Sequence, residues 1–73
     1  MNVTVRSTDD VRIDPAQLVG SCRRFGLYGP IYEIIAVGAV SPSEGLLMQV
    51  RVVTTGETVD YPLADILDDP LER

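Results

Sequence analysis

Histidine, lysine and tryptophan are absent from this 73-residue sequence, and cysteine occurs once, at Cys22. The lone cysteine excludes a disulfide within the chain. Without histidine, the sequence lacks the residue most often used for general acid–base catalysis and a common metal ligand. We therefore predict no catalytic residue, no metal site and no cofactor, and we predict that the protein is not an enzyme.

Cys22 leaves one catalytic alternative open. Arg23 and Arg24 follow it directly, and neighbouring positive charge favours the reactive thiolate. A free cysteine more often behaves as a small buried apolar residue. The buried, unreactive thiol is therefore the preferred interpretation.

Positive charge is also scarce, because six arginines stand against eleven acidic residues and the net charge is −5. Proteins that bind phosphate backbones or anionic membranes need an excess of basic residues, so both partners are disfavoured. No apolar run approaches the ~20 residues that span a bilayer, and the first residues lack the basic and apolar segments of a signal peptide. We predict a cytoplasmic protein with a reduced thiol.

Three apolar segments, 31–40, 46–55 and 58–63, follow one another with only short turn sequences between them. In the second segment, Met48, Val50 and Val52 alternate with more polar residues, as expected for a strand with one buried face. The pattern predicts an antiparallel meander. Its predicted core consists of Ile34, Val50, Val52, Val59 and Tyr61.

The turns of the meander predict its register. The loop 41–45 places Val40 opposite Leu46, and a regular ladder then places Ile34 opposite Val52. The second turn needs an even number of residues, since a slip of one residue would bury Asp60. Two-residue turns at 55–56 or 56–57 and a four-residue turn at 54–57 all satisfy this condition, and the turn at 55–56 would place Arg51 opposite Asp60.

The other face of the meander is unusually apolar for a half-solvated antiparallel sheet. The residues that would contribute most to it are Ile35, Val37, Leu47 and Val53. We expect such an apolar face to be shielded from water, either by another segment of the same chain or by a second copy of the protein. We predict that it forms the face of a symmetric homodimer.

The segments around the meander predict short helices and one further strand. The sequence predicts a helical turn that begins with Asp14 as the N-cap and Pro15 as the first helical residue. Gln17 would complete a capping box, and Gly20 would end the turn. Residues 22–25 form a candidate short strand, and 25–30 form a loop rich in glycine. Apolar residues at i, i+3 and i+4 within 63–67 predict one or two helical turns.

The predicted fold is a single small β domain over 1–73, with 1–16 as a loosely attached N-terminal arm. It is mainly β, an antiparallel meander with short helical turns, and it is similar to the central part of an SH3-like barrel. Such barrels add a last strand after the helical turn, whereas only 68–73 remain here. We expect any closing strand to come from 3–5 or 19–25.

The best candidate binding site combines arginine and tyrosine, which dominate interface hot spots. Its members are Arg23, Arg24, Phe25, Tyr28 and Tyr32. Glycines in the same loop would allow a partner to approach closely. The competing interpretation places the aromatic rings in the core and leaves the arginines in water.

The segments FGLYGPIYE (25–33), VRVVTTGE (50–57) and DYPL (60–63) resemble a small family of uncharacterised bacterial proteins. The shared patterns are FG-x-x-GP-x-YE and TGE-x-x-DYPL, and the resemblance extends over 17–70. It implies a bacterial source and a single compact domain, and it carries no known activity or binding residue. The leading prediction is a non-catalytic protein-interaction or accessory module, and the alternative is a ligand- or nucleic-acid-binding adaptor that uses the Arg23-Arg24-Phe25 loop.

Overall fold

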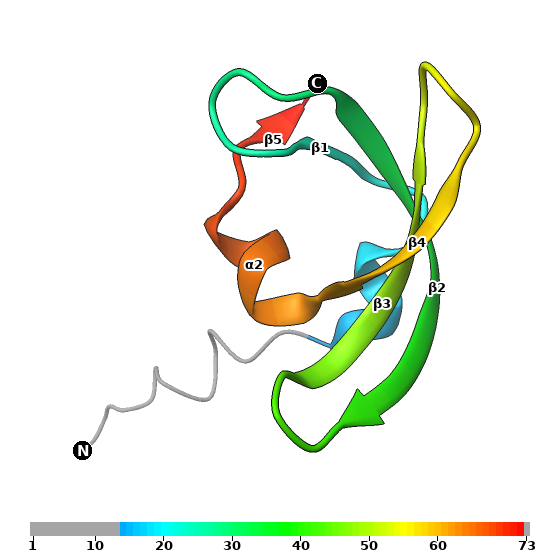
Figure 1. Cartoon of the computed structure of the whole chain (residues 1–73), viewed down its shortest axis with the longest axis vertical. Helices are drawn as coiled ribbons and strands as arrows, with labels where there is room; N and C mark the ends of the chain where they lie inside the picture. The colour runs from blue at the N-terminus through cyan, green and yellow to red at the C-terminus, as the bar shows by residue number, and fades with distance from the viewer. Residues whose placement is uncertain (1–13, 73) are drawn as a thin grey trace.

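The computed structural model describes residues 14–72, and much of the predicted N-terminal arm lies outside them. A five-stranded antiparallel sheet has the order β4-β3-β2-β1-β5, with a short helix between β4 and β5 (Figure 1). The elements are the 3₁₀-helix η1 (Pro15–Leu18), β1 (Cys22–Arg24), β2 (Ile31–Ser41), β3 (Gly45–Val52), β4 (Thr58–Pro62), α2 (Leu63–Asp68) and β5 (Leu71–Glu72). The mainly β fold is confirmed.

The hairpin of β2 and β3 contains two irregularities that alternation alone did not predict. Val40 lies opposite Leu46 as expected, but Ile34 lies opposite Val50 and not Val52. The pairing shifts by one residue twice, each time because β2 contains one residue more than β3. Gly38 lies at the second shift, where an added Cβ would stand 2.8 Å from the carbonyl oxygen of Leu47, so the close approach requires glycine.

The turn between β3 and β4 has four residues, 53–56, between Val52 and Glu57. The amide of Val52 donates to the Glu57 carbonyl at 2.8 Å, and the amide of Gly56 donates to the Val52 carbonyl at 2.7 Å. The turn has an even number of residues, as predicted. Its position at 53–56 differs from all three predicted positions, 55–56, 56–57 and 54–57. Arg51 lies opposite Thr58 and not Asp60.

The shifts in β2 also divide the predicted apolar outer face. Val37 lies opposite the buried Met48, so it belongs to the inner side of the sheet and not to the outer side as predicted. On the outer side, Glu33 forms an ion pair with Arg51 across the two strands. The homodimer stays a prediction: of the residues from which it was inferred, Ile35 and Leu47 are half-buried, and Val37 and Val53 are exposed.

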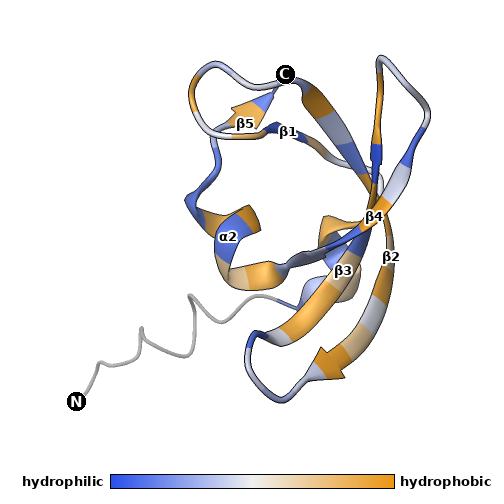
Figure 2. Ribbon diagram, viewed as in Figure 1, coloured by the Kyte–Doolittle hydropathy of each residue, from blue (hydrophilic) through white to orange (hydrophobic). Residues whose placement is uncertain are grey.

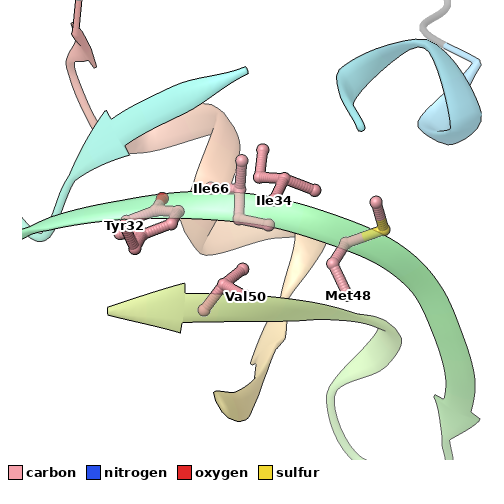
Figure 3. Packing of buried hydrophobic residues seen from close by; sticks show 5 residues of the cluster. All are labelled: Tyr32, Ile34, Met48, Val50 and Ile66. Carbon is pink, nitrogen blue, oxygen red and sulfur yellow. The ribbon is translucent and has the colours of Figure 1, made fainter. Parts of the chain in front are cut away.

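Five fully buried side chains form the core, which lies between the sheet and α2 (Figure 3). They are Tyr32, Ile34, Met48, Val50 and Ile66. Of the predicted core, Ile34 and Val50 are correct, and Val59 and Tyr61 are half-buried against the cluster. Val52 is half-buried, because the shifted register moves it toward the end of the ladder opposite Tyr32.

The helical predictions at both ends hold in outline. The side chain of Asp14 caps η1 by accepting a hydrogen bond from the amide of Ala16. The amide of Gln17, which a capping box would join to that side chain, donates to the backbone carbonyl of Asp14. α2 follows Pro62 and places Ile66 in the core. No helix within 14–72 has the length and apolar character needed to cross a lipid bilayer.

The last strand corrects the expectation about barrel closure. β5 does follow the helix, and it pairs with β1, so that Leu71 lies opposite Arg23 and Glu72 opposite Cys22. The short strand predicted at 22–25 is therefore present as β1, and it pairs with a strand on each side. Within residues 14–72 the sheet remains open between β4 and β5, and α2 occupies the space between these two edges (Figure 1).

Candidate functional site

Three of the four aromatic side chains of the protein pack together beside the β1–β2 loop. The ring centroids of Phe25 and Tyr32 are 4.3 Å apart, and those of Phe25 and Tyr61 are 5.0 Å apart in an edge-to-face arrangement. Such offset and edge-to-face pairs are favourable beyond the apolar area that they bury. The cluster holds the first residue of the loop, Phe25, against the core.

The carboxylate of Asp69 binds this cluster to the loop. Its Oδ2 accepts hydrogen bonds from the hydroxyl groups of Tyr32 at 2.8 Å and Tyr61 at 2.9 Å. Its Oδ1 accepts from the backbone amide of Gly26 at 3.1 Å. One side chain at the end of α2 therefore joins β2, β4 and the loop. Its bonds are strong ones, because hydrogen bonds to a charged acceptor are among the stronger ones in proteins.

These contacts keep both tyrosines neutral. Burial, followed by the hydrogen bond to Asp69, raises the pKa of Tyr32 well above its usual value of 10.0. The same two causes, in the same order, raise the pKa of Tyr61 to about 12. An ionised tyrosine at either position would lose its proton donor role and repel the carboxylate. Neither hydroxyl is thus suited to act as a base near neutral pH.

Arg23 is directed inward, toward the segment that follows α2. Its Nη1 donates to the carbonyl oxygens of Ile66 at 3.0 Å and Asp69 at 3.1 Å. Carbonyls at the end of a helix are favourable partners for a cation. Its Nε is the one buried side-chain nitrogen or oxygen within 14–72 that has no hydrogen-bond partner. The guanidinium group of Arg23 thus joins β1 to the end of α2 and stabilises the fold.

Arg24 closes the base of the loop from the other side of the strand. Its Nη1 donates to the carbonyl of Gly29 at 3.0 Å, and its Nε donates to Oε1 of Glu72 at 3.3 Å. The amide of Gly29 donates to the carbonyl of Phe25 at 2.9 Å. An added Cβ at Gly29 would stand 2.2 Å from that same carbonyl oxygen, so only glycine fits this turn.

The tip of the loop has the opposite character to its base. Leu27 is 73% exposed and Tyr28 is 94% exposed. We refer to these two side chains as the loop-tip surface. Figure 2 shows hydrophilic residues along the adjacent connection between α2 and β5. The loop therefore presents two large side chains to solvent from a backbone that is bonded at Gly26, Gly29 and Phe25.

The structure brings the predicted binding residues to one end of the sheet but gives them different environments. Tyr32 is fully buried and Phe25 is half-buried against the core. Arg23 and Arg24 are half-buried and bonded within the chain, which leaves Tyr28 as the exposed member. Sequence reasoning missed Asp69, because no local pattern distinguishes it from Asp68.

Residues 4–73 match the model of a family described as Family of unknown function (DUF5397).

The chain belongs to this family. The membership expected from the sequence is thereby confirmed, and the match extends further at both ends than the resemblance at 17–70. A search of the curated proteins finds no match to this chain. The family description adds no activity, so any functional argument depends on the geometry of the site.

Proposed function

We propose that this protein of the DUF5397 family is a non-catalytic protein-interaction module of the bacterial cytoplasm, and that the loop-tip surface makes the central contact. The exposed side chain of Tyr28 carries this proposal. The other three aromatic side chains of the chain are packed together, and Tyr28 alone extends into solvent. Tyrosine is among the residues that contribute most to binding energy at protein interfaces.

The firmly held base of the loop supports the same conclusion. Binding costs less entropy when the contact residues are already fixed in the bound conformation. The hydrogen bonds of Asp69 to Gly26 and of Gly29 to Phe25 restrict the backbone on both sides of Leu27 and Tyr28.

The alternative, an adaptor that binds nucleic acid or an anionic ligand through Arg23 and Arg24, receives less support. Within 14–72 there are three arginines, and each of them makes hydrogen bonds inside the chain. A phosphate would have to displace these partners. Residues 14–72 also form no pocket for a small ligand.

A comparative pull-down tests the proposal. The double variant Leu27→Ser/Tyr28→Ser removes the loop-tip surface without touching the bonded base. Val40→Ser is the matched control, because Val40 is 74% exposed and lies near the β2–β3 turn, at the opposite end of the sheet. We expect wild type and V40S to retain a common partner from a lysate of the source organism, and the double variant to lose it. Identical sets of bound proteins for all three would refute the proposal.

A further inference from the structure

The segment that carries Asp69 is strongly acidic and runs along the base of the loop. Residues 65–72 contain four carboxylates and no basic residue: Asp65, Asp68, Asp69 and Glu72. Besides the contacts of Arg23, Arg24 and β5 described above, the segment is bonded to the loop and its strand from Gly26 to Asp69 and from the amide of Arg24 to the carbonyl of Pro70 at 3.1 Å. The acidic segment and the loop therefore lie side by side (Figure 1).

Within residues 14–72, one carboxylate of this segment is seen in an ion pair. Arg24 forms an ion pair with Glu72, and Arg23 donates to backbone carbonyls and not to a carboxylate. Asp65 and Asp68 are exposed. The exposed carboxylates of this segment would attract a cationic partner.

The ring of Tyr28 adds a second property that favours a cation. An exposed aromatic face attracts a guanidinium or ammonium group through its quadrupole. Tyr28 is 94% exposed, so its ring is available to a partner, and Leu27 beside it offers an apolar contact. The aromatic face and the apolar side chain thus lie on the loop to which Asp69 of the acidic segment is bonded.

We infer that the partner presents a basic segment, with an arginine or lysine side chain over the ring of Tyr28, an apolar side chain against Leu27, and further basic residues facing the acidic segment 65–72. This inference rests on the proposed function and specifies the chemistry of the partner. It commits to a cationic protein segment, because a polyanion would be repelled by the same carboxylates.

Selection from a phage-displayed library of random 12-residue peptides tests this inference with the whole chain as bait. The selection is made at low ionic strength, where charge contacts are screened least. We expect the bound peptides to be enriched in arginine or lysine together with an apolar residue. Binding of the selected synthetic peptides is then measured by fluorescence anisotropy against three variants.

The variants separate the contributions. Leu27→Ser/Tyr28→Ser should weaken binding by about 10-fold or more, as expected for the loss of a hot spot. Tyr28→Phe keeps the aromatic face and should bind within about 3-fold of wild type. Asp65→Asn/Asp68→Asn removes two exposed charges, leaves the hydrogen bonds of Asp69 in place, and should reduce both the affinity and its dependence on salt.

The possible outcomes distinguish the two proposals. Selected peptides that are neutral or acidic, and that still need Leu27 and Tyr28, would overturn the inference and leave the proposed function standing. Basic peptides that bind the L27S/Y28S variant as tightly as wild type would overturn both. A library that yields no peptide dependent on the loop-tip surface would count against both as well.

Discussion

The two ends of the sheet are stabilised by different kinds of contact. The β2–β3–β4 meander is held by apolar side chains such as Ile34, Met48 and Val50, which are fully buried. The end formed by β1, its loop and β5 is held largely by polar contacts made by Arg23, Arg24 and Asp69. The first end depends on area removed from water, and the second on a few directed hydrogen bonds.

This difference explains why the exposed loop tip lies at the polar end. Hydrogen bonds hold the backbone of the loop and leave its side chains available. Leu27 and Tyr28 are exposed for this reason, while Phe25 anchors the start of the loop.

The largest effect is expected at the apolar end. Val50→Asp would place an unpaired charge in a fully buried position, at a cost of several kcal/mol. A domain of this size has a free energy of unfolding of roughly 4–10 kcal/mol. We expect urea titration followed by circular dichroism to show no cooperative transition for this variant. The control Val53→Asp changes a 55% exposed residue and should unfold like wild type; equal behaviour of the two would mean that the core is placed incorrectly.

The next effect tests the polar end. Asp69→Ala removes the acceptor of three hydrogen bonds and leaves the buried hydroxyl of Tyr32 without a partner, which should cost about 2–4 kcal/mol. Chemical denaturation measures this loss directly. Asp68→Ala is the matched control, since Asp68 is exposed, and should change the stability by less than about 0.5 kcal/mol. A D69A variant as stable as D68A would remove the distinction between the two ends.

A rise in pH should weaken the polar end further. The raised pKa values of Tyr32 and Tyr61 mean that the folded state keeps both protons above pH 10.0, where the unfolded chain begins to release them. The free energy of unfolding should thus hold its tyrosine contribution below pH 10 and lose it as the pH rises through about 12. Urea midpoints measured from pH 8 to pH 12 would show the decline. Tyr61→Phe should make it shallower, and an unchanged slope would contradict the role given to Asp69.

The smallest effect is expected on the outer side of the meander. Glu33 and Arg51 form an ion pair, but both side chains are partly exposed to water. A double-mutant cycle with alanine at both positions should give a coupling energy of about 0.2–1 kcal/mol, which decreases in high salt. A coupling energy as large as the decrease in the free energy of unfolding in D69A would show that this exposed ion pair stabilises the fold as much as the Asp69 carboxylate does.

The sequence predicted the meander well because its cause is local. Alternation of apolar residues along 46–52 identifies the inner face of β3, and the even turn length follows from it. The exact pairing was missed, since a bulge adds one residue without changing the overall apolar pattern. Gly38 marks the second bulge, and the approach of the Leu47 carbonyl that requires it is visible only in the folded hairpin.

The candidate site was predicted in part. The loop 25–30 followed from composition, whereas the structural roles of Arg23 and Tyr32 did not. Tyr32 lies opposite Val52 on the inner side of β2 and is fully buried. Its position in the strand, and not its residue type, therefore decides that it belongs to the core. β5 was missed because two residues carry no periodic pattern.

The sequence by itself determined the three strands of the meander, the inner face of β3 and the loop 25–30, since period two and turn residues act between near neighbours in the chain. Only the tertiary structure decided which polar groups meet. Asp69 lies 37 residues from Tyr32 and 43 from Gly26, and no local pattern relates them. The carboxylate finds its three donors because the burial of Ile66 and the pairing of β5 with β1 carry the end of α2 to the β1–β2 loop.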